Sequence, residues 1–171
     1  MDFSNTLETA KNLLGMYLIH ETPKGIIKGK IIETEAYLQN DPASHSYNGL
    51  TNRNSAMFEE PGTIYVYFTY GMYHCMNIVT NKKGIGEAVL IRAIEPIEGI
   101  ELMKKNRGKE KNLCDGPAKL TIAFGINKEH NNAKLNSKLR LETGEKPKKI
   151  YSSKRIGISK GKDLKYRFYI K

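Results

Sequence analysis

The sequence predicts an α+β fold in a single domain, with a curved, mostly antiparallel sheet and a few helices segregated from it. Three observations support this prediction. The chain has 171 residues, the length of one domain. Its 39% hydrophobic and 27% charged residues are the proportions of an ordinary globular protein. Runs rich in β-branched and aromatic residues follow one another across turn signals, and only three longer segments have a helical pattern.

The first element is expected to be a helix at residues 4–15. Asn5 or Thr6 can cap its start, because a short polar side chain accepts a hydrogen bond from the unpaired N–H groups of the first turn. Gly15 can end it, since glycine readily adopts the left-handed conformation that follows helices.

Strand-like runs come next. Residues 16–21 and 25–37 are joined by a turn signal that contains Pro and Gly, and together they predict a hairpin. Residues 38–62 are polar and rich in turn formers, which in a compact domain indicates a functional or disordered loop. We expect a second hairpin at 63–78 and a further apolar strand at 86–94.

Two helices are expected in the second half of the chain. One is predicted at residues 95–106, with Pro96 in its first turn. A shorter one is predicted at 116–125, starting at Pro117, because proline suits the first turn of a helix. The remainder is expected to consist of lysine-rich loops and short strands.

The positive charge is concentrated in the last two-fifths of the chain. Residues 1–100 contain 8 Lys and Arg against 11 Asp and Glu, a balance of −3, and residues 101–171 contain 20 against 7, a balance of +13. This asymmetry favours a polyanionic partner, since Lys and Arg that neutralise phosphates release condensed counterions. A solvated, solubilising surface is the alternative, and charge alone does not decide between the two.

The two cysteines, Cys75 and Cys114, are too few for a disulfide framework and indicate reduced thiols in a cytoplasm. No apolar run approaches the roughly 20 residues that a membrane helix needs, and the N-terminus lacks a basic-then-apolar signal. We therefore expect a cytoplasmic protein without membrane contact.

The stretch TIYVYFTYGMYHCMNI contains four tyrosines around one glycine. Because side chains alternate along a strand, Tyr65 and Tyr67 are expected on one face of the hairpin, and Tyr73, Cys75 and Asn77 in one row of the returning strand. Tyrosine has a high strand propensity, so this periodicity alone is explained by a half-buried hairpin.

Tyr70 is not explained in that way. Gly71 permits a turn with positive φ, which leaves Tyr70 near the tip of the hairpin with its ring in solvent. An exposed aromatic side chain in such a place is typical of the wedges that proteins insert between base pairs.

Glu33, Glu35 and Tyr37 occupy every second position of a predicted strand and therefore point to the same side. A carboxylate beside an aromatic ring can act as a general base, orienting water against a carbon that becomes cationic in the transition state. Arg92, within an apolar strand, is the expected counter-charge, because a buried arginine needs a carboxylate. The alternative is a structural ion pair between Arg92 and one of the two glutamates.

The sequence contains no metal or nucleotide motif. His20, His45, His74 and His130 show no metal-ligand spacing, and neither a nucleophile elbow nor a P-loop occurs. We therefore expect no metal site and no cofactor. His45 gains interest if the long loop that carries it closes over Glu35.

Five blocks occur in a fixed order: IIETEAY, ASHS, PGTIYVYFTYGMYHCMNI, VLIRAIEP and CDGPAKLTIAFGIN. Together they resemble the alkyladenine (3-methyladenine) DNA glycosylases, over most of residues 7–170. The resemblance implies one DNA glycosylase domain at residues 1–171. Its α+β fold would have a curved, partly barrel-like antiparallel sheet, flanking helices and a protruding β-hairpin that enters the DNA minor groove.

The resemblance also implies roles for individual residues. Glu35 would be the general base that activates the attacking water, and Arg92 would help to hold that water and the carboxylate. Tyr37 and Tyr67 would stack on a flipped base, and His45 would complete the wall of the pocket.

Asn77 would stand on the pocket floor and obstruct the 2-amino group of normal guanine, and Tyr70 would fill the vacated stack as a wedge. Further DNA contacts are implied for Met57, Met72, Tyr73 and Gly157. Lys154 and Arg155 would support the contact of Gly157 with phosphate.

The implied function is that of a monofunctional DNA glycosylase. It would flip alkylated or deaminated purines out of duplex DNA and hydrolyse the N-glycosidic bond, initiating base excision repair. The expected partner is duplex DNA containing damaged purines, bound by a monomer in a bacterial-type cytoplasm, at the nucleoid. We expect neither a cofactor nor a Schiff-base lysine, because the lysines are concentrated away from the blocks that form the pocket.

Two other functions remain open on the residues alone. A carbohydrate-active hydrolase would use Glu33 and Glu35 as its acid–base pair, but it would not need the basic half of the chain. A nucleic-acid-binding module without catalysis would use the tyrosines as a stacking platform. For such a module Glu35 would be a cost, because an anion facing DNA is unfavourable unless it takes part in chemistry.

Overall fold

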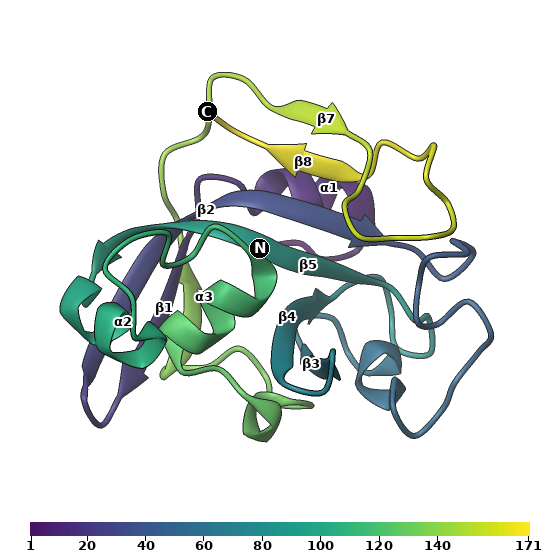
Figure 1. The fold of residues 1–171 in the computed structure, drawn as a ribbon. Coiled ribbons are helices and arrows are strands. Elements are labelled where there is room, and N and C mark those ends of the chain that lie inside the picture. The colour runs from purple at the N-terminus through teal and green to yellow at the C-terminus, as the bar shows by residue number, and fades with distance from the viewer.

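A computed structural model describes residues 1–171 as one curled antiparallel sheet of eight strands with three α-helices around it (Figure 1). The strands are β1 (Tyr17–Thr22), β2 (Gly25–Tyr37), β3 (Ile64–Thr69), β4 (Tyr73–Val79), β5 (Ala88–Glu98), β6 (Leu139–Glu142), β7 (Tyr151–Ser153) and β8 (Arg167–Tyr169). The helices are α1 (Thr6–Asn12), α2 (Ile100–Arg107) and α3 (Pro117–Phe124), with two 3-10 turns, η1 (Ser55–Phe58) and η2 (Lys128–His130). The α+β prediction is confirmed.

The long strand β2 organises the sheet. The strand order is β3-β4-β5-β2-β1-β6, and β5 pairs with β2 along almost all of its length. The opposite edge of β2 is shared, because β1 pairs with its first half and β8 with Glu33–Glu35. β7 pairs with β8, so these two strands of the C-terminal segment extend the sheet beside this part of β2 (Figure 1). The centre of β2 is therefore enclosed by strands from distant parts of the chain.

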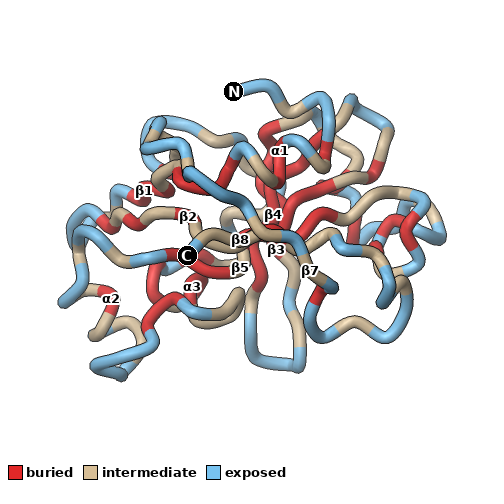
Figure 2. The backbone as a smooth tube through the Cα atoms, turned by 90° about the horizontal axis from the view of Figure 1, so that it is seen from above, coloured by how far each residue is buried: buried red, intermediate tan, exposed pale blue.

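The first helix follows the sequence prediction. The side chain of Asn5 accepts a hydrogen bond from the backbone N–H of Glu8, which makes it the N-cap of α1, and Gly15 after the helix has a φ of +86°. The hydroxyl of Thr34 in β2 donates to the carbonyl of Ala10, which fixes α1 against the sheet. Figures 1 and 2 show α1 on one side of the sheet and α2 and α3 on the other.

The prediction of a helix at 95–106 was wrong at its start. Residues up to Glu98 continue β5, and α2 begins at Ile100, after Gly99 with a φ of +74°. Glu95 and Pro96 pair with β2, and the proline lies beside an irregularity in the register, where its missing N–H does least harm. Pairing with a distant strand thus outweighs the local preference of proline for a helix start.

Buried residues occupy the middle of the molecule (Figure 2). The main core is a cluster of 23 residues between the sheet and the helices, and Ile64 and Val66 of β3 enter it. Tyr65 and Tyr67 point to the other side, where Tyr65 belongs to a smaller cluster of five buried residues with Met57 of η1. The alternation predicted for this hairpin is confirmed, so Tyr65 and Tyr67 face away from the main core.

At Gly29, β2 and β5 lie too close together to leave room for a side chain. A Cβ atom at this position would lie 2.3 Å from Cγ2 of Ile94 and 2.8 Å from the carbonyl oxygen of Glu95. We expect Gly29→Ala to lower the free energy of unfolding by about 1–3 kcal/mol, because backbone and core would have to shift. The matched control is Gly116→Ala, whose nearest neighbour lies 3.7 Å away. Urea denaturation of both variants measures the difference, and equal losses would contradict a close approach at Gly29.

Candidate active site

A cavity of about 480 Å³ opens where β2, β5 and the β3–β4 hairpin meet the long loop after β2 and the loop after β7. This volume is in the range of small-molecule sites, roughly 300–1,000 Å³. Nine of the eleven site residues expected from the sequence line it: Glu35, Tyr37, His45, Met57, Tyr67, Tyr70, Asn77, Arg92 and Gly157. The fold therefore brings together residues that are up to 122 positions apart, from 35 to 157.

Glu35 is the centre of the polar contacts in this cavity, and it has no exposed surface. Its Oε1 accepts a hydrogen bond of 2.9 Å from the backbone N–H of Ile156, and its Oε2 accepts one of 2.8 Å from the hydroxyl of Tyr37. Nε of Arg92 lies 3.5 Å from Oε1. A buried carboxylate needs hydrogen-bond donors and a counter-charge in place of water, and here these three partners come from three separate segments.

Arg92 contacts a second carboxylate more closely. Its Nε lies 2.7 Å from Oε1 of Glu33, and the same oxygen accepts a hydrogen bond of 2.5 Å from Nε of Arg167. Glu33 and Glu35 thus share the face of β2 that the sequence predicted. Glu33 does not line the cavity, however, and its carboxylate is paired with two arginines, Arg92 and Arg167. This placement argues against a hydrolase in which Glu33 and Glu35 act as an acid–base pair on one substrate.

Aromatic rings form the walls of the cavity. The ring centroids of His45 and Tyr67 are 4.5 Å apart at an interplanar angle of 74°, and Nδ1 of His45 lies 2.9 Å from the hydroxyl oxygen of Tyr65. Tyr65 was expected on the same face as Tyr67 but was not assigned to the site, and it too lines the cavity.

Burial keeps these walls uncharged near neutral pH. It raises the pKa of Tyr65 to about 12, and it also raises the pKa of Tyr37 and Tyr67, with the charge of Glu35 adding to the shift at Tyr37. Burial, helped by the nearby Arg53, lowers the pKa of His45. The phenols are therefore protonated and the imidazole neutral at pH 7.

Two smaller groups stand among these rings. The side-chain N–H of Asn77 donates to the backbone oxygen of Tyr65 at 3.1 Å, and Asn77 itself is buried. Cys75 also lines the cavity, and burial raises the pKa of its thiol, which keeps it from acting as a thiolate nucleophile.

The tip of the β3–β4 hairpin is the most exposed part of the site. Tyr70 is 84% exposed, and both it and Gly71 have positive φ, +51° and +68°. The turn predicted at Gly71 is confirmed, and it includes a tyrosine in a conformation that residues with side chains seldom adopt. Met72 and Tyr73, the two expected residues that do not line the cavity, are exposed beside this tip.

Met57 and Gly157 lie in different settings. Met57 is buried beneath the cavity, in the smaller core cluster, so any DNA contact that it makes is with a group inside the cavity. Gly157 is exposed at the rim, with a φ of +75° and open space on the side where a Cβ atom would stand.

Arg155 was expected to support a phosphate contact at Gly157, and this expectation was wrong. The side chain of Arg155 is buried and forms a bidentate ion pair with Asp41. It also donates a hydrogen bond to the backbone oxygen of Ala36 at 2.9 Å. Its guanidinium also lies 4.6 Å from the ring centroid of Tyr37. Arg155 thus anchors the loop whose next residue supplies the N–H to Glu35. No local signal separates it from the other basic residues of the tail.

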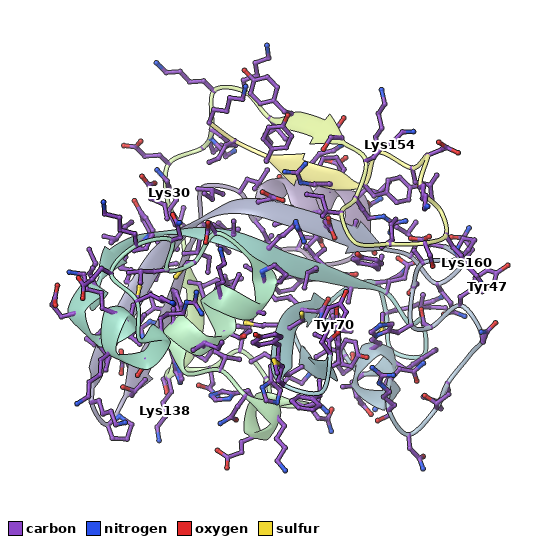
Figure 3. All side chains as sticks on the ribbon, in the orientation of Figure 1. Lys30, Tyr47, Tyr70, Lys138, Lys154 and Lys160 are labelled. Carbon is purple, nitrogen blue, oxygen red and sulfur yellow. The ribbon has the colours of Figure 1, made fainter.

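One lysine departs from the expected distribution. Lys160 lines the cavity, although the lysines were expected away from the pocket, and it is exposed on the loop after β7 (Figure 3). Lys154, on the same loop, pairs with the exposed Asp163 at 3.0 Å. The basic tail therefore contributes both a wall of the cavity and charge at its mouth.

The structure contains no group of three or more His, Cys, Asp or Glu side chains placed to hold a metal ion. None of its helices combines the length and the apolar character that crossing a bilayer requires.

The ion pair between Asp41 and Arg155 should contribute strongly to stability. We expect Asp41→Asn to lower the free energy of unfolding by about 3–5 kcal/mol, because it leaves a buried guanidinium without a counter-charge. The matched control is Asp163→Asn, which removes the exposed partner of Lys154 and should cost at most about 1 kcal/mol. Denaturant unfolding compares the two, and a small effect at Asp41 would show that Arg155 reaches solvent.

Comparison with known proteins gives one consistent result. Residues 2–171 match the family described as methylpurine-DNA glycosylase. A protein of Francisella tularensis subsp. tularensis is 53% identical, over 97% of this chain and 90% of the relative. Proteins of Carboxydothermus hydrogenoformans and Chlorobium phaeobacteroides are 50% and 51% identical, over 98% and 96% of this chain and 91% and 86% of their own.

All three relatives carry the name "Putative 3-methyladenine DNA glycosylase". The family match covers almost the whole chain and therefore includes the strands, loops and tail that enclose the cavity. The chain belongs to the methylpurine-DNA glycosylase family, a family of DNA N-glycosylases.

Proposed function

We propose that this protein is a monofunctional DNA glycosylase that extrudes an alkylated or deaminated purine from duplex DNA and hydrolyses the bond between base and deoxyribose. Residues 1–171 would act as one domain and as a monomer, with the cavity lined by residues of this chain. The observation that carries the proposal is the buried Glu35, held by two hydrogen-bond donors and an arginine within a cavity walled by uncharged aromatic rings.

In the proposed reaction Glu35 is the general base. It takes a proton from a water molecule whose oxygen attacks C1′ of the deoxyribose, while the bond from C1′ to the purine nitrogen breaks and its electron pair leaves with the base. Arg92 holds the carboxylate and the water near it. The donors around Glu35 are fixed by the backbone and by packing, so little reorganisation is needed when charge develops on the sugar.

The walls suit a cationic purine. Alkylation at N3 or N7 makes the base positive, and the faces of Tyr37 and Tyr67 attract a cation by roughly 0.5–2 kcal/mol. A neutral His45 adds no repulsion. Asn77 on the floor is in a position to obstruct the 2-amino group of normal guanine, since its amide is fixed by the backbone of Tyr65.

A base can reach the cavity only outside the helical stack, at an unstacking cost of a few kcal/mol. Tyr70 at the hairpin tip is proposed to fill the gap, with Met72 and Tyr73 beside it on the groove. The open backbone at Gly157 and the charge of Lys160 would meet the phosphates at the rim. We place this activity in the bacterial cytoplasm, at the nucleoid.

The two alternatives account for less. A carbohydrate-active enzyme does not explain the exposed Tyr70 or the +13 balance of residues 101–171. A binding module without catalysis does not explain why Glu35 is buried at the base of the cavity, where an unused carboxylate is a cost in free energy.

The direct test is incubation with methylated duplex DNA and with a duplex that contains hypoxanthine, followed by detection of free bases. We expect release of the damaged base with an intact strand until alkali is added, because no lysine is assigned to the chemistry. Strand cleavage without alkali that disappears in Lys160→Ala would instead show a Schiff-base step at that lysine.

Glu35→Gln should reduce base release by at least about 10²-fold, because a general base contributes 10²–10⁴-fold to such rates. Its affinity for a methylated duplex should stay near that of the unmodified protein. The matched control, Glu95→Gln, removes a carboxylate of β5 that lies outside the cavity and pairs with Lys30. Single-turnover release and binding by anisotropy separate the two effects, and a parallel loss of binding in Glu35→Gln would point to a structural role.

Tyr70→Ala should weaken binding to a duplex with a damaged base by roughly 1–3 kcal/mol, the range for a base stacked on an aromatic side chain. Phe68→Ala is the control, since Phe68 is an exposed ring of the same hairpin that does not line the cavity. A 2-aminopurine probe next to the lesion reports extrusion. If both variants bind and extrude equally well, Tyr70 is not the wedge.

A further inference from the structure

Four charged side chains form a row across three neighbouring strands. Arg167 belongs to β8, Glu33 and Glu35 to β2, and Arg92 to β5. The contacts run in sequence: Nε of Arg167 to Oε1 of Glu33 at 2.5 Å, that oxygen to Nε of Arg92 at 2.7 Å, and that nitrogen to Oε1 of Glu35 at 3.5 Å. Only Glu35 and Arg92 line the cavity.

We propose that Glu33 and Arg167 are positioning residues, which set how closely Arg92 approaches Glu35 and thereby adjust Glu35 as a general base. This inference rests on the proposed function and extends it to two side chains outside the cavity. Glu33 and Glu35 compete for one guanidinium, and the shorter distance belongs to Glu33. Glu33 thus draws Arg92 away from a tight ion pair with the catalytic carboxylate.

Arg167 limits this competition from the other side. It binds the same oxygen of Glu33 that Arg92 binds, so part of the negative charge of Glu33 is already neutralised. Nη1 of Arg167 also donates to Oγ of Ser153 at 3.2 Å, at the end of β7. The loop that begins there carries Ile156, whose N–H binds Glu35. The row therefore connects the position of Arg92 with the loop that closes the cavity.

Partial burial makes the row sensitive to each of its charges. The side chains of Glu33, Arg92 and Arg167 are 17%, 16% and 22% exposed. Charges so poorly screened interact more strongly than they would in water. Glu33 and Glu35 repel each other, and each arginine offsets that repulsion. Replacing Glu33 and replacing Arg167 by neutral residues should therefore shift the pH dependence of the reaction in opposite directions.

The groups that face Glu35 come from every element packed against it. They are Tyr37 on β2, Arg92 on β5, Arg167 on β8 and Cys75 on β4, together with the backbone N–H of Ile156. Tyr37 and Cys75 are neutral at pH 7, because burial raises the pKa of both. Arg155, behind the ring of Tyr37, is already paired with Asp41. Arg92, Arg167 and Glu33 are therefore the charges whose replacement should shift the acidic limb of the pH–rate profile.

The experiment is a pH profile of single-turnover base release from a methylated duplex, with enzyme in excess. Glu33→Gln lets Arg92 close on Glu35, so the acidic limb should move to lower pH and the plateau rate should fall about tenfold, while the duplex affinity changes less than twofold. Arg167→Gln leaves Glu33 with Arg92 alone, so the limb should move to higher pH. In the double variant Glu33→Gln/Arg167→Gln the limb should return toward its original position.

Glu21→Gln is the matched control, since Glu21 forms a similar glutamate–arginine pair with Arg140 between β1 and β6, away from the cavity. Its limb should not move. A purely structural role of Glu33 and Arg167 would lower the free energy of unfolding in both variants and leave both limbs in place, and that result overturns the inference. A shift of the acidic limb in the same direction in Glu33→Gln and Arg167→Gln also overturns the inference. If the unmodified protein releases no base, the proposed function itself fails.

Discussion

The site depends on one constraint, the burial of Glu35 in the middle of β2. A carboxylate without exposed surface costs several kcal/mol unless hydrogen-bond donors replace its water. The donors are Tyr37 on the same strand and the backbone of Ile156 after β7, and Arg92 on β5 supplies the counter-charge. Each belongs to a different part of the chain, so the carboxylate is satisfied only when the sheet has closed around β2. The chemistry and the assembly of the fold are therefore linked at one side chain.

The C-terminal segment shows how that closure is achieved. It contributes most of the positive charge, yet two of its arginines face inward rather than toward a polyanion. Arg155 holds the loop after β2 through Asp41, and Arg167 holds Glu33. The loop between these arginines forms the rim of the cavity, at Gly157 and Lys160. The C-terminal segment thus supplies positive charge that attracts DNA and also the ion pairs that hold the walls of the site in place.

Local rules predicted much of this molecule because they do not depend on neighbours. The two-residue period of a strand placed Tyr65 and Tyr67 on one face whatever packed against them, and the cap at Asn5 needed only its own helix. The helix start at Pro96 was wrong, since pairing with β2 overrode the local preference. Nothing local distinguished Met57, which is buried, from an exposed loop residue.

The strand faces and the turn at Gly71 followed from the sequence alone, because period and turn geometry are properties of short segments. The sequence also supplied the carboxylate and the aromatic side chains to which we assign the proposed glycosidic hydrolysis. Which charged groups reach the cavity depended instead on the packing of distant segments. That packing placed Lys160 at the rim, buried Arg155 and kept Glu33 outside the lining. The reason is that burial and ion pairing are set by contacts between segments far apart in the chain, whose free energies no local pattern contains.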